Sequence, residues 1–254
     1  MIYNGKSAET TSYKLLENTP YVIELTALLR DEFKDIFKKP FDDALVKPME
    51  MAVKALCDQI PVVYYAYCCY DKIYILCDEI NSLEDNSYFD NDIQAINSFF
   101  ASGMSLTFNR ALESFMNDYY KKNAESSSFD DEEMLYYMKL MQIVKKGTGF
   151  LAKTYNVNPN DVIDFFVFRQ RELIQRSIEI YGEYYLSLSK EKLKSYGIFE
   201  IQNMLEAKGI LWEIEPLQYQ RGFFYINDDE GNDMQIDREI PIIADNTLYL
   251  KGDY

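Results

Sequence analysis

The sequence predicts a mixed α/β protein of the α+β type, with a split-βαβ antiparallel sheet, packed helices and a helical C-terminal extension. Segments with strand character and segments with helical periodicity follow one another in the order β-α-β-β-α-β, and further helical segments come after them. The chain has 254 residues, of which 48% are hydrophobic and 15% aromatic, so it can bury a full core. Length, composition and element order therefore agree on one core with a helical addition.

The first half of the predicted sheet comes from three short segments. Residues 21–25 are rich in β-branched and aromatic side chains, which is typical of a strand. A helix capped by Asp42 is predicted over residues 42–59, because apolar residues recur there at helical spacing. A second strand is predicted over residues 62–67, and a turn at 69–71 leads into the returning strand at 73–77.

The middle of the chain contains two predicted helices and the fourth strand. Residues 81–91 are polar and acidic and read as a loop, and residues 92–120 carry a long helical pattern. The serine-rich stretch 121–131 resembles a linker and precedes a second helix at 132–146. Residues 150–157 alternate as a strand does.

The C-terminal third is predicted to be mainly helical. Asn158 begins a helix that runs towards residue 185, and shorter helices are expected at 189–196 and 197–208. Two further strand candidates flank a turn at residues 229–232; they lie at 223–226 and 247–251.

The composition excludes several kinds of chemistry. The chain has no histidine, so Ser-His-Asp and Cys-His catalysis and His-ligated zinc are excluded. The four cysteines cluster at positions 57, 68, 69 and 77, a spacing that suits neither a disulfide framework nor a CxxC zinc site. A reduced, cytoplasmic setting is the simpler interpretation. No run of 18 apolar residues predicts a membrane span, and no signal peptide is visible.

The formal net charge of −16 bears on the possible partners. Nucleic-acid binding proteins are usually basic, because much of their affinity comes from neutralising phosphates, so extended duplex binding is disfavoured. A small basic pocket for one nucleotide or one RNA end remains open. A basic protein partner is a third possibility, because a strong acidic field steers association.

Several segments, in this order, resemble motifs of the tRNA(His) guanylyltransferase-like family of 3′–5′ polymerases. They are Phe37-Lys38-Lys39-Pro40-Phe41-Asp42, Ala66-Tyr67-Cys68-Cys69-Tyr70-Asp71-Lys72, Phe150-Leu151-Ala152-Lys153-Thr154-Tyr155-Asn156-Val157, Phe168-Arg169-Gln170-Arg171-Glu172 and, after the helix at 200–209, Arg221-Gly222. The resemblance implies a palm-like fold, Mg²⁺ and GTP or ATP as ligands, a tRNA 5′ end as acceptor, and a homo-oligomer. With it, we expect a palm-like nucleotidyltransferase domain at 1–160, a continuous helical extension at 161–226 and an acidic tail with short strands at 227–254.

The family's metal site is altered in this chain. The strand-1 metal aspartate falls on Thr26, and two glycines that let the backbone approach phosphates fall on Ala27 and Leu29. Asp71 stands at the retained catalytic and metal position, although an aspartate at a hairpin turn has a purely structural interpretation too. Glu24 lies on the same strand face as Thr26, where it either replaces the lost ligand or joins a structural ion pair.

The resemblance also assigns nucleotide and RNA contacts. Lys39 and Asp42 fall near the triphosphate, and Lys72, where the family has a glutamate, either holds a phosphate or forms a salt bridge. RNA contacts fall on Lys153, Arg169, Gln170 and Arg221. At i, i+3 spacing, Arg169 can instead pair with Glu172 on its own helix.

Three functions follow from these residues. The first is a palm protein with a degenerate metal site that binds a nucleotide or an RNA 5′ end without efficient nucleotidyl transfer. The second is an active metal-dependent nucleotidyltransferase that uses Asp71 with Glu24 or Asp31. The third is an acidic protein-binding module.

Overall fold

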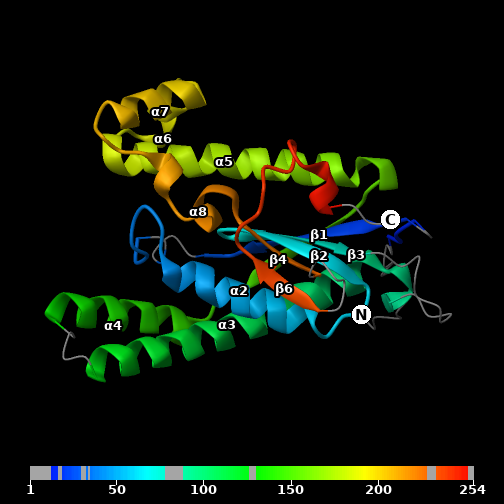
Figure 1. The fold of residues 1–254 in the computed structure, drawn as a ribbon. Helices are drawn as coiled ribbons and strands as arrows, with labels where there is room; N and C mark the ends of the chain where they lie inside the picture. Colours follow the sequence, from blue (N-terminus) through cyan, green and yellow to red (C-terminus); the bar gives the residue numbers. More distant parts are fainter. Residues whose placement is uncertain are drawn as a thin grey trace, which may run out of the picture.

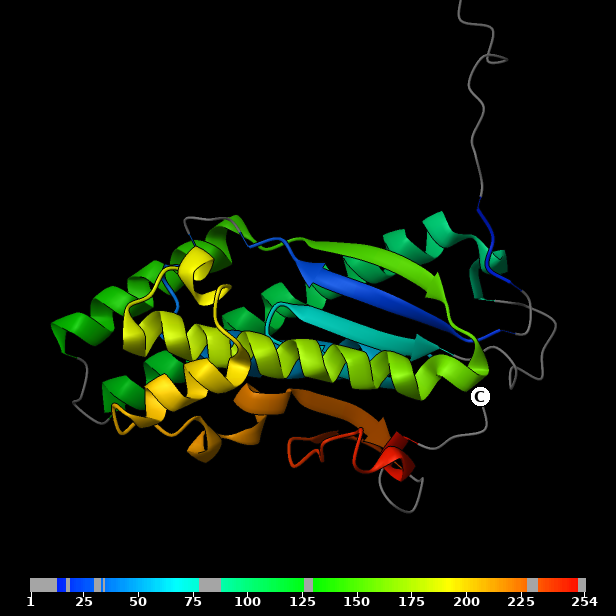
Figure 2. The ribbon, with the colours of Figure 1, turned by 90° about the horizontal axis from the view of Figure 1, so that it is seen from above.

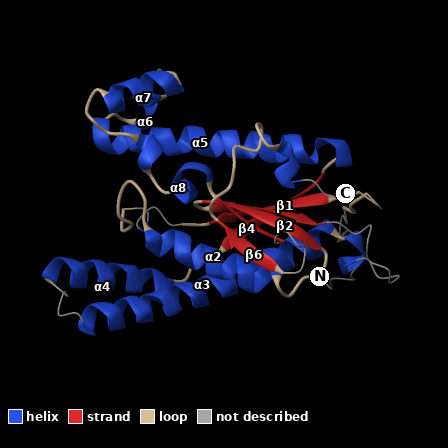
Figure 3. Cartoon of the chain, in the orientation of Figure 1, coloured by secondary structure: helices blue, strands red, loops and turns tan. Residues whose placement is uncertain are grey.

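The computed structural model describes residues 13–16, 19–29, 33, 35–77, 88–125, 130–227 and 233–250. Their centre is a six-stranded antiparallel sheet with the strand order β4-β1-β3-β2-β5-β6. The strands are β1 (Tyr21–Ala27), β2 (Val63–Cys69), β3 (Lys72–Cys77), β4 (Phe150–Asn156), β5 (Phe223–Asn227) and β6 (Met234–Asp237). Helices cover both faces of this sheet, which gives three layers (Figures 1 and 3).

One face of the sheet packs against α2 (Asp43–Cys57) and α3 (Ile93–Glu125), and α4 (Asp131–Lys146) packs beside α3 (Figure 1). Alternate strand residues such as Ile23, Leu25 and Ile75 point into this layer and are fully buried. The two main helices approach closely, because a Cβ on Gly103 would lie 2.9 Å from Leu56 Cδ1. This side holds the larger part of the core.

The opposite face packs against α5 (Val162–Leu186), which crosses the sheet as Figure 2 shows from above. Val22, Tyr67 and Tyr74 point to this face and are buried with Phe166 of α5. The segment that ends in the 3₁₀ helix η4 (Thr247–Leu250) adds further apolar side chains to the same cluster. Glu24 and Lys72 lie on this face too, since strand side chains alternate.

A small helical cluster extends from the C-terminal end of α5. It consists of α6 (Lys190–Leu193), α7 (Ile198–Glu206), the 3₁₀ helix η3 (Trp212–Ile214) and α8 (Leu217–Arg221). Its own core joins Tyr181 of α5 to Leu193, Ile201 and Trp212. Gly182 allows this contact, since a Cβ there would meet Leu193 at 2.8 Å. The α8 helix then leads directly into β5.

The predicted fold class is confirmed, and the differences concern element ends and the C-terminal region. Residues 247–250 form a 3₁₀ helix instead of the predicted strand, and β6 takes the place of the second strand candidate. The predicted helix at 189–196 is confined to Lys190–Leu193, and α8 was not predicted. No helix in the described ranges is long and apolar enough to cross a membrane.

The two segments expected to be irregular are partly regular. The 3₁₀ helix η1 (Tyr88–Asn91) occupies the end of the predicted loop, and α3 continues to Glu125 into the predicted linker. The rest of that loop, residues 126–129 of the linker and the turn at 229–232 lie outside the described residues. The sequence placed the boundary between the helical extension and the acidic tail at residue 226. That residue lies within β5, which pairs with β2 on one side and with β6 on the other.

Candidate functional site

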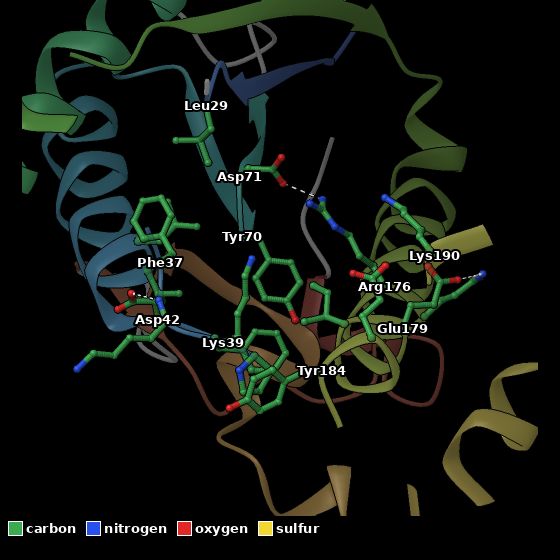
Figure 4. Close-up of a pocket in the computed structure, with 18 of the residues that line it drawn as sticks. Leu29, Phe37, Lys39, Asp42, Tyr70, Asp71, Arg176, Glu179, Tyr184 and Lys190 are labelled. Atoms are coloured by element: carbon green, nitrogen blue, oxygen red, sulfur yellow. Dashed lines mark hydrogen bonds and ion pairs between the residues drawn. The ribbon is translucent and has the colours of Figure 1, made fainter. Parts of the chain in front are cut away.

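An open cleft of about 720 Å³ lies where the β2–β3 hairpin tip faces the start of α2 and the C-terminal half of α5 (Figure 4). One wall is the segment at residues 37–42, and the other is the α5 face that carries Glu172, Arg176 and Glu179. Lys190 extends the second wall. The cleft therefore gathers charged side chains from segments that are far apart in sequence.

Asp42 fixes the first wall. Its side chain caps α2 by accepting a hydrogen bond from the backbone N–H of Ala44 at 2.8 Å, as the sequence predicted. The other carboxylate oxygen accepts from the backbone N–H of Lys38 at 2.6 Å and from the Tyr136 hydroxyl. Asp42 lines the cleft, but its oxygens are already used to hold the wall in place.

The α4 helix braces this wall from outside. Lys38 forms an ion pair with Glu133 at 3.0 Å, and its ammonium lies 4.5 Å from the centre of the Tyr136 ring. Glu133 and Tyr136 both belong to α4, the helix predicted from the sequence at residues 132–146. The structure gives that helix a position against the cleft.

Stacked aromatic rings form the base of the cleft. Phe41 lies between Tyr70 and Tyr219, with ring centroids 5.3 Å and 4.9 Å away and nearly parallel planes. The Tyr70 hydroxyl donates to the Tyr219 carbonyl at 2.5 Å. Tyr70 has a φ of 52°, a left-handed conformation that costs energy for a residue with a side chain, so these contacts hold the hairpin tip.

Asp71, the residue at the expected metal position, is ion-paired with Arg176 of α5 at 2.7 Å (Figure 4). The Asp71 side chain is 24% exposed and that of Arg176 is 46% exposed, so the pair borders the open cleft. The guanidinium also lies 5.6 Å from the centre of the Tyr70 ring. A cation of the chain itself thus contacts the carboxylate that the family resemblance assigns to a metal ion.

Glu24, the second candidate ligand, is also paired. Its buried carboxylate accepts from the Lys72 ammonium at 2.8 Å and from the Tyr155 hydroxyl at 3.1 Å. Burial opposes ionisation of Glu24, but the hydrogen bond and charge of Lys72 outweigh it and hold the pKa of Glu24 below its ordinary value. The structural ion pair, one of the two predicted roles of Glu24, is therefore the one observed.

The described residues do not fit a two-ion centre for Mg²⁺, and Asp31, the alternative ligand offered by the sequence, lies outside the described residues. In the described part of the chain, no three acidic or cysteine side chains converge in a way that could hold a metal ion. Asp71 and Glu24 are each held by a basic side chain, and Thr26 stands where the resemblance expects the other carboxylate. Mg²⁺ prefers several hard oxygen ligands in a near-octahedral arrangement, which these residues do not offer.

The predicted nucleotide contacts separate into two places. Lys39 lines the cleft and points along Tyr70 towards the hairpin tip (Figure 4). Lys72 is not among the cleft-lining residues, because its ammonium is directed to Glu24 on the α5 face of the sheet. The structure thus brings Lys39, Asp42 and Asp71 together and leaves Lys72 apart.

None of the four predicted RNA contacts lines the cleft. Lys153 is exposed on β4, opposite Glu24 in the strand register. Arg169 pairs with Glu172 at 2.7 Å, as its spacing predicted, and lies over the ring of Tyr74.

The other two predicted RNA contacts hold the C-terminal segment. Gln170 is buried, donates to the Pro241 carbonyl at 2.9 Å and accepts from the Ile243 N–H at 2.9 Å. Arg221 donates to the Ile240 carbonyl at 3.3 Å. Both interactions fasten residues 240–243 against α5 and the sheet.

The cysteines are structural. All four are buried thiols, and burial raises the pKa of Cys68 and raises that of Cys69 to about 12. Such thiols stay protonated near neutral pH and are poor nucleophiles. Cys68 and Cys69 therefore serve to pack β2 against its neighbours.

Sequence reasoning missed Arg176, Lys190 and Tyr184 as cleft residues. A signal for the α5 contribution was available, because positions 172, 175, 176, 179 and 183 lie on one face of a helix and all are polar or charged. That pattern identifies a polar helix face, although the element facing it becomes visible only in the fold.

Fold and site together define a palm-type α+β protein with an open, charged cleft at the tip of its central hairpin. A family model described as "Thg1: tRNAHis guanylyltransferase" matches residues 4–161, more than half of the chain. The chain therefore belongs to the tRNAHis guanylyltransferase family, as its ordered motifs predicted. No curated protein sequence matches the chain significantly.

Two solved bacterial structures and one yeast structure have a similar fold. A bacterial tRNA(His) guanylyltransferase (Thg1)-like protein in complex with ATP is 22% identical, with a TM-score of 0.75, and the match covers 94% of this chain and 91% of that one. A bacterial Thg1-like protein in complex with GTP is 21% identical, with a TM-score of 0.66 and coverages of 94% and 90%. The tRNA(His) guanylyltransferase from Saccharomyces cerevisiae is 14% identical, with a TM-score of 0.67 and coverages of 93% and 96%. At these identities the likeness shows the fold.

Proposed function

We propose that this protein binds a nucleoside triphosphate in the cleft and does not carry out efficient nucleotidyl transfer. Family membership supports a nucleotide ligand, and bacterial structures of the same fold contain ATP and GTP. The cleft volume of about 720 Å³ is within the usual range for a small-molecule site. Lys39 and Arg176 on opposite walls provide positive charge for phosphates.

The observation that carries the proposal is the Asp71–Arg176 ion pair. Phosphoryl-group transfer in palm-type and related enzymes relies on divalent ions that neutralise the triphosphate and align the attacking and leaving oxygens. A carboxylate held by a guanidinium has one of its oxygens occupied, and a second cation nearby is repelled by the guanidinium charge. Among the described residues the other candidate ligand is Glu24, which is held in the same way by Lys72.

What the residues of this chain provide is binding and orientation. Asp42 holds the first wall in place, and Phe41 stacks on Tyr70 of the hairpin tip, so a ligand meets walls that are already ordered. The ammonium of Lys39 and the guanidinium of Arg176 neutralise phosphate charge. A nucleotide-binding palm protein without transfer activity is the result.

Two measurements test this function. Isothermal titration with ATP and GTP is expected to show binding, and Lys39→Ala is expected to weaken it by about three- to tenfold, the effect of one charge-assisted contact. Lys139→Ala, at an exposed position on α4, is the matched control and should leave affinity unchanged. An assay for metal-dependent nucleotide addition to a labelled tRNA 5′ end is expected to give no product. Robust addition that Asp71→Ala abolishes would instead establish the active enzyme.

A further inference from the structure

We propose that Arg176 takes the place of a divalent cation in this cleft, so that the polyphosphate chain of the nucleotide binds to the protein without metal. The proposal rests on the proposed function and names the chemistry that holds the ligand. Its basis is the position of the guanidinium, at the carboxylate that the family resemblance assigns to a metal and at the border of an open cleft.

Arg176 has hydrogen-bonding capacity to spare for a ligand. Within the described part of the chain its guanidinium donates one hydrogen bond, from Nη1 to Asp71, and the side chain is 46% exposed. A guanidinium carries five N–H donors in a planar fork that matches phosphate oxygens. The ring of Tyr70 on one side and Asp71 on the other keep that fork in a defined orientation.

The cleft also contains acidic side chains, and their interactions decide how a polyanion could enter. Asp42 is used as a helix cap, Glu172 is paired with Arg169, and Glu179 accepts a hydrogen bond from Gln175. Without an external cation, phosphate binding in such surroundings depends on the basic side chains that line the cleft. They are Lys39, Arg176 and Lys190, since the ammonium of Lys38 is paired with Glu133 of α4.

Asp71 then has a role opposite to that of a metal ligand. In a metal site, its removal would weaken metal-dependent nucleotide binding. Here it competes with phosphate for the Arg176 guanidinium and repels the incoming charge, so its neutralisation should strengthen binding. The sign of the Asp71→Asn effect therefore distinguishes a guanidinium site from a metal site.

The experiment is isothermal titration of the full chain with ATP, GTP and inorganic tripolyphosphate, each in EDTA and in Mg²⁺. We expect binding in EDTA that is at least as tight as in Mg²⁺, a loss of about tenfold or more in Arg176→Gln, and partial retention in Arg176→Lys. Asp71→Asn should gain about fivefold in EDTA, a result that misfolding cannot produce. Arg171→Gln, at an exposed position on the same helix, is the control and should match the wild type.

The outcomes separate the two proposals. Nucleotide binding that requires Mg²⁺, or that weakens in Asp71→Asn, would overturn the role of Arg176 and leave nucleotide binding intact. Binding of ATP in EDTA with no binding of tripolyphosphate would overturn the claim that the phosphates carry the affinity. Absence of binding in both buffers would overturn the proposed function together with this inference.

Discussion

Replacing Lys72 with methionine tests whether the Glu24–Lys72 pair is structural. The substitution keeps a long unbranched side chain but leaves the buried carboxylate of Glu24 with the Tyr155 hydroxyl as its remaining partner of those described. Removing one member of a fully buried ion pair costs about 3–5 kcal/mol, because an uncompensated charge stays in the interior. Exposed pairs contribute about 0–1 kcal/mol.

The Glu24–Lys72 pair lies between these limits, since the carboxylate is buried and the Lys72 side chain is 34% exposed. We therefore expect Lys72→Met to lower the free energy of unfolding at neutral pH by about 1–2 kcal/mol. In a chain of this length that corresponds to a fall in Tm of about 2–8 °C. Urea denaturation followed by tryptophan fluorescence and thermal denaturation followed by circular dichroism measure the two quantities.

The pH dependence of the unfolding free energy is a second test of the Glu24–Lys72 pair. The folded-state pKa of Glu24 lies below its ordinary value of 4.5, so the stabilisation by Lys72 is complete above that value and is lost as the pH falls through the lower, folded-state pKa. In Lys72→Met, burial without the ammonium raises the pKa of Glu24, and protonation relieves the buried charge. The difference in unfolding free energy between the two proteins should therefore shrink as the pH falls, first through the raised pKa of Glu24 in the variant and then through its lowered pKa in the wild type.

Lys47→Met is the matched control, because Lys47 and Asp43 form an i, i+4 pair at 2.6 Å whose side chains are 51% and 44% exposed. It should cost less than about 0.5 kcal/mol. The double variant Glu24→Gln with Lys72→Met should recover most of the loss, since no charge remains buried. Equal costs for Lys72→Met and Lys47→Met, or a difference that stays constant with pH, would refute the structural role.

Two further substitutions separate holding the fold from binding a ligand. Asp42→Ala should lower the free energy of unfolding by about 1–2 kcal/mol, since it removes the cap of α2. Asp42→Asn should lose less, because its amide oxygen can still cap the helix although its NH₂ cannot accept from the Lys38 N–H; equal losses in chemical denaturation would contradict the capping role. Gln170→Met should cost about 1–3 kcal/mol and expose the segment at 240–243 to proteolysis, because a buried carbonyl and N–H lose their partner; Arg171→Met is the control, and unchanged digestion would contradict the clamp.

Much of the fold could be predicted because its signals are local. The β2–β3 hairpin and the cap at Asp42 depend on residues close together in the chain, and the structure confirms both. The sequence placed Thr26 near the end of the first strand, and in the structure Thr26 lies near the end of β1, paired with Lys72 of β3. The C-terminal region was less predictable, since residues 247–250 have strand-like composition but pack as a 3₁₀ turn against α5 and the sheet.

The candidate site could be predicted only in part, because its decisive contacts join distant segments. Asp71 was identified from its motif, but its partner Arg176 lies 105 residues further along the chain, and no local pattern pairs the two. Gln170 was assigned to RNA because its motif matches the family, while its burial depends on a segment more than seventy residues away. Motifs locate a residue on the fold, and the interactions that set its role depend on tertiary contacts.

The two ion pairs supply positive charge to the carboxylates near the hairpin, which the proposed metal-free function requires. Carboxylates gathered at the end of a sheet repel one another, and their ionised forms need nearby positive charge. Here Lys72 supplies that charge to Glu24, and Arg176 supplies it to Asp71 from across the cleft. Because Lys72 comes from β3 and Arg176 from α5, each pair also ties the hairpin to a neighbouring element. Under the proposed function these cations balance the carboxylates in place of metal ions, so the thermal denaturation midpoint should be the same in EDTA and in Mg²⁺.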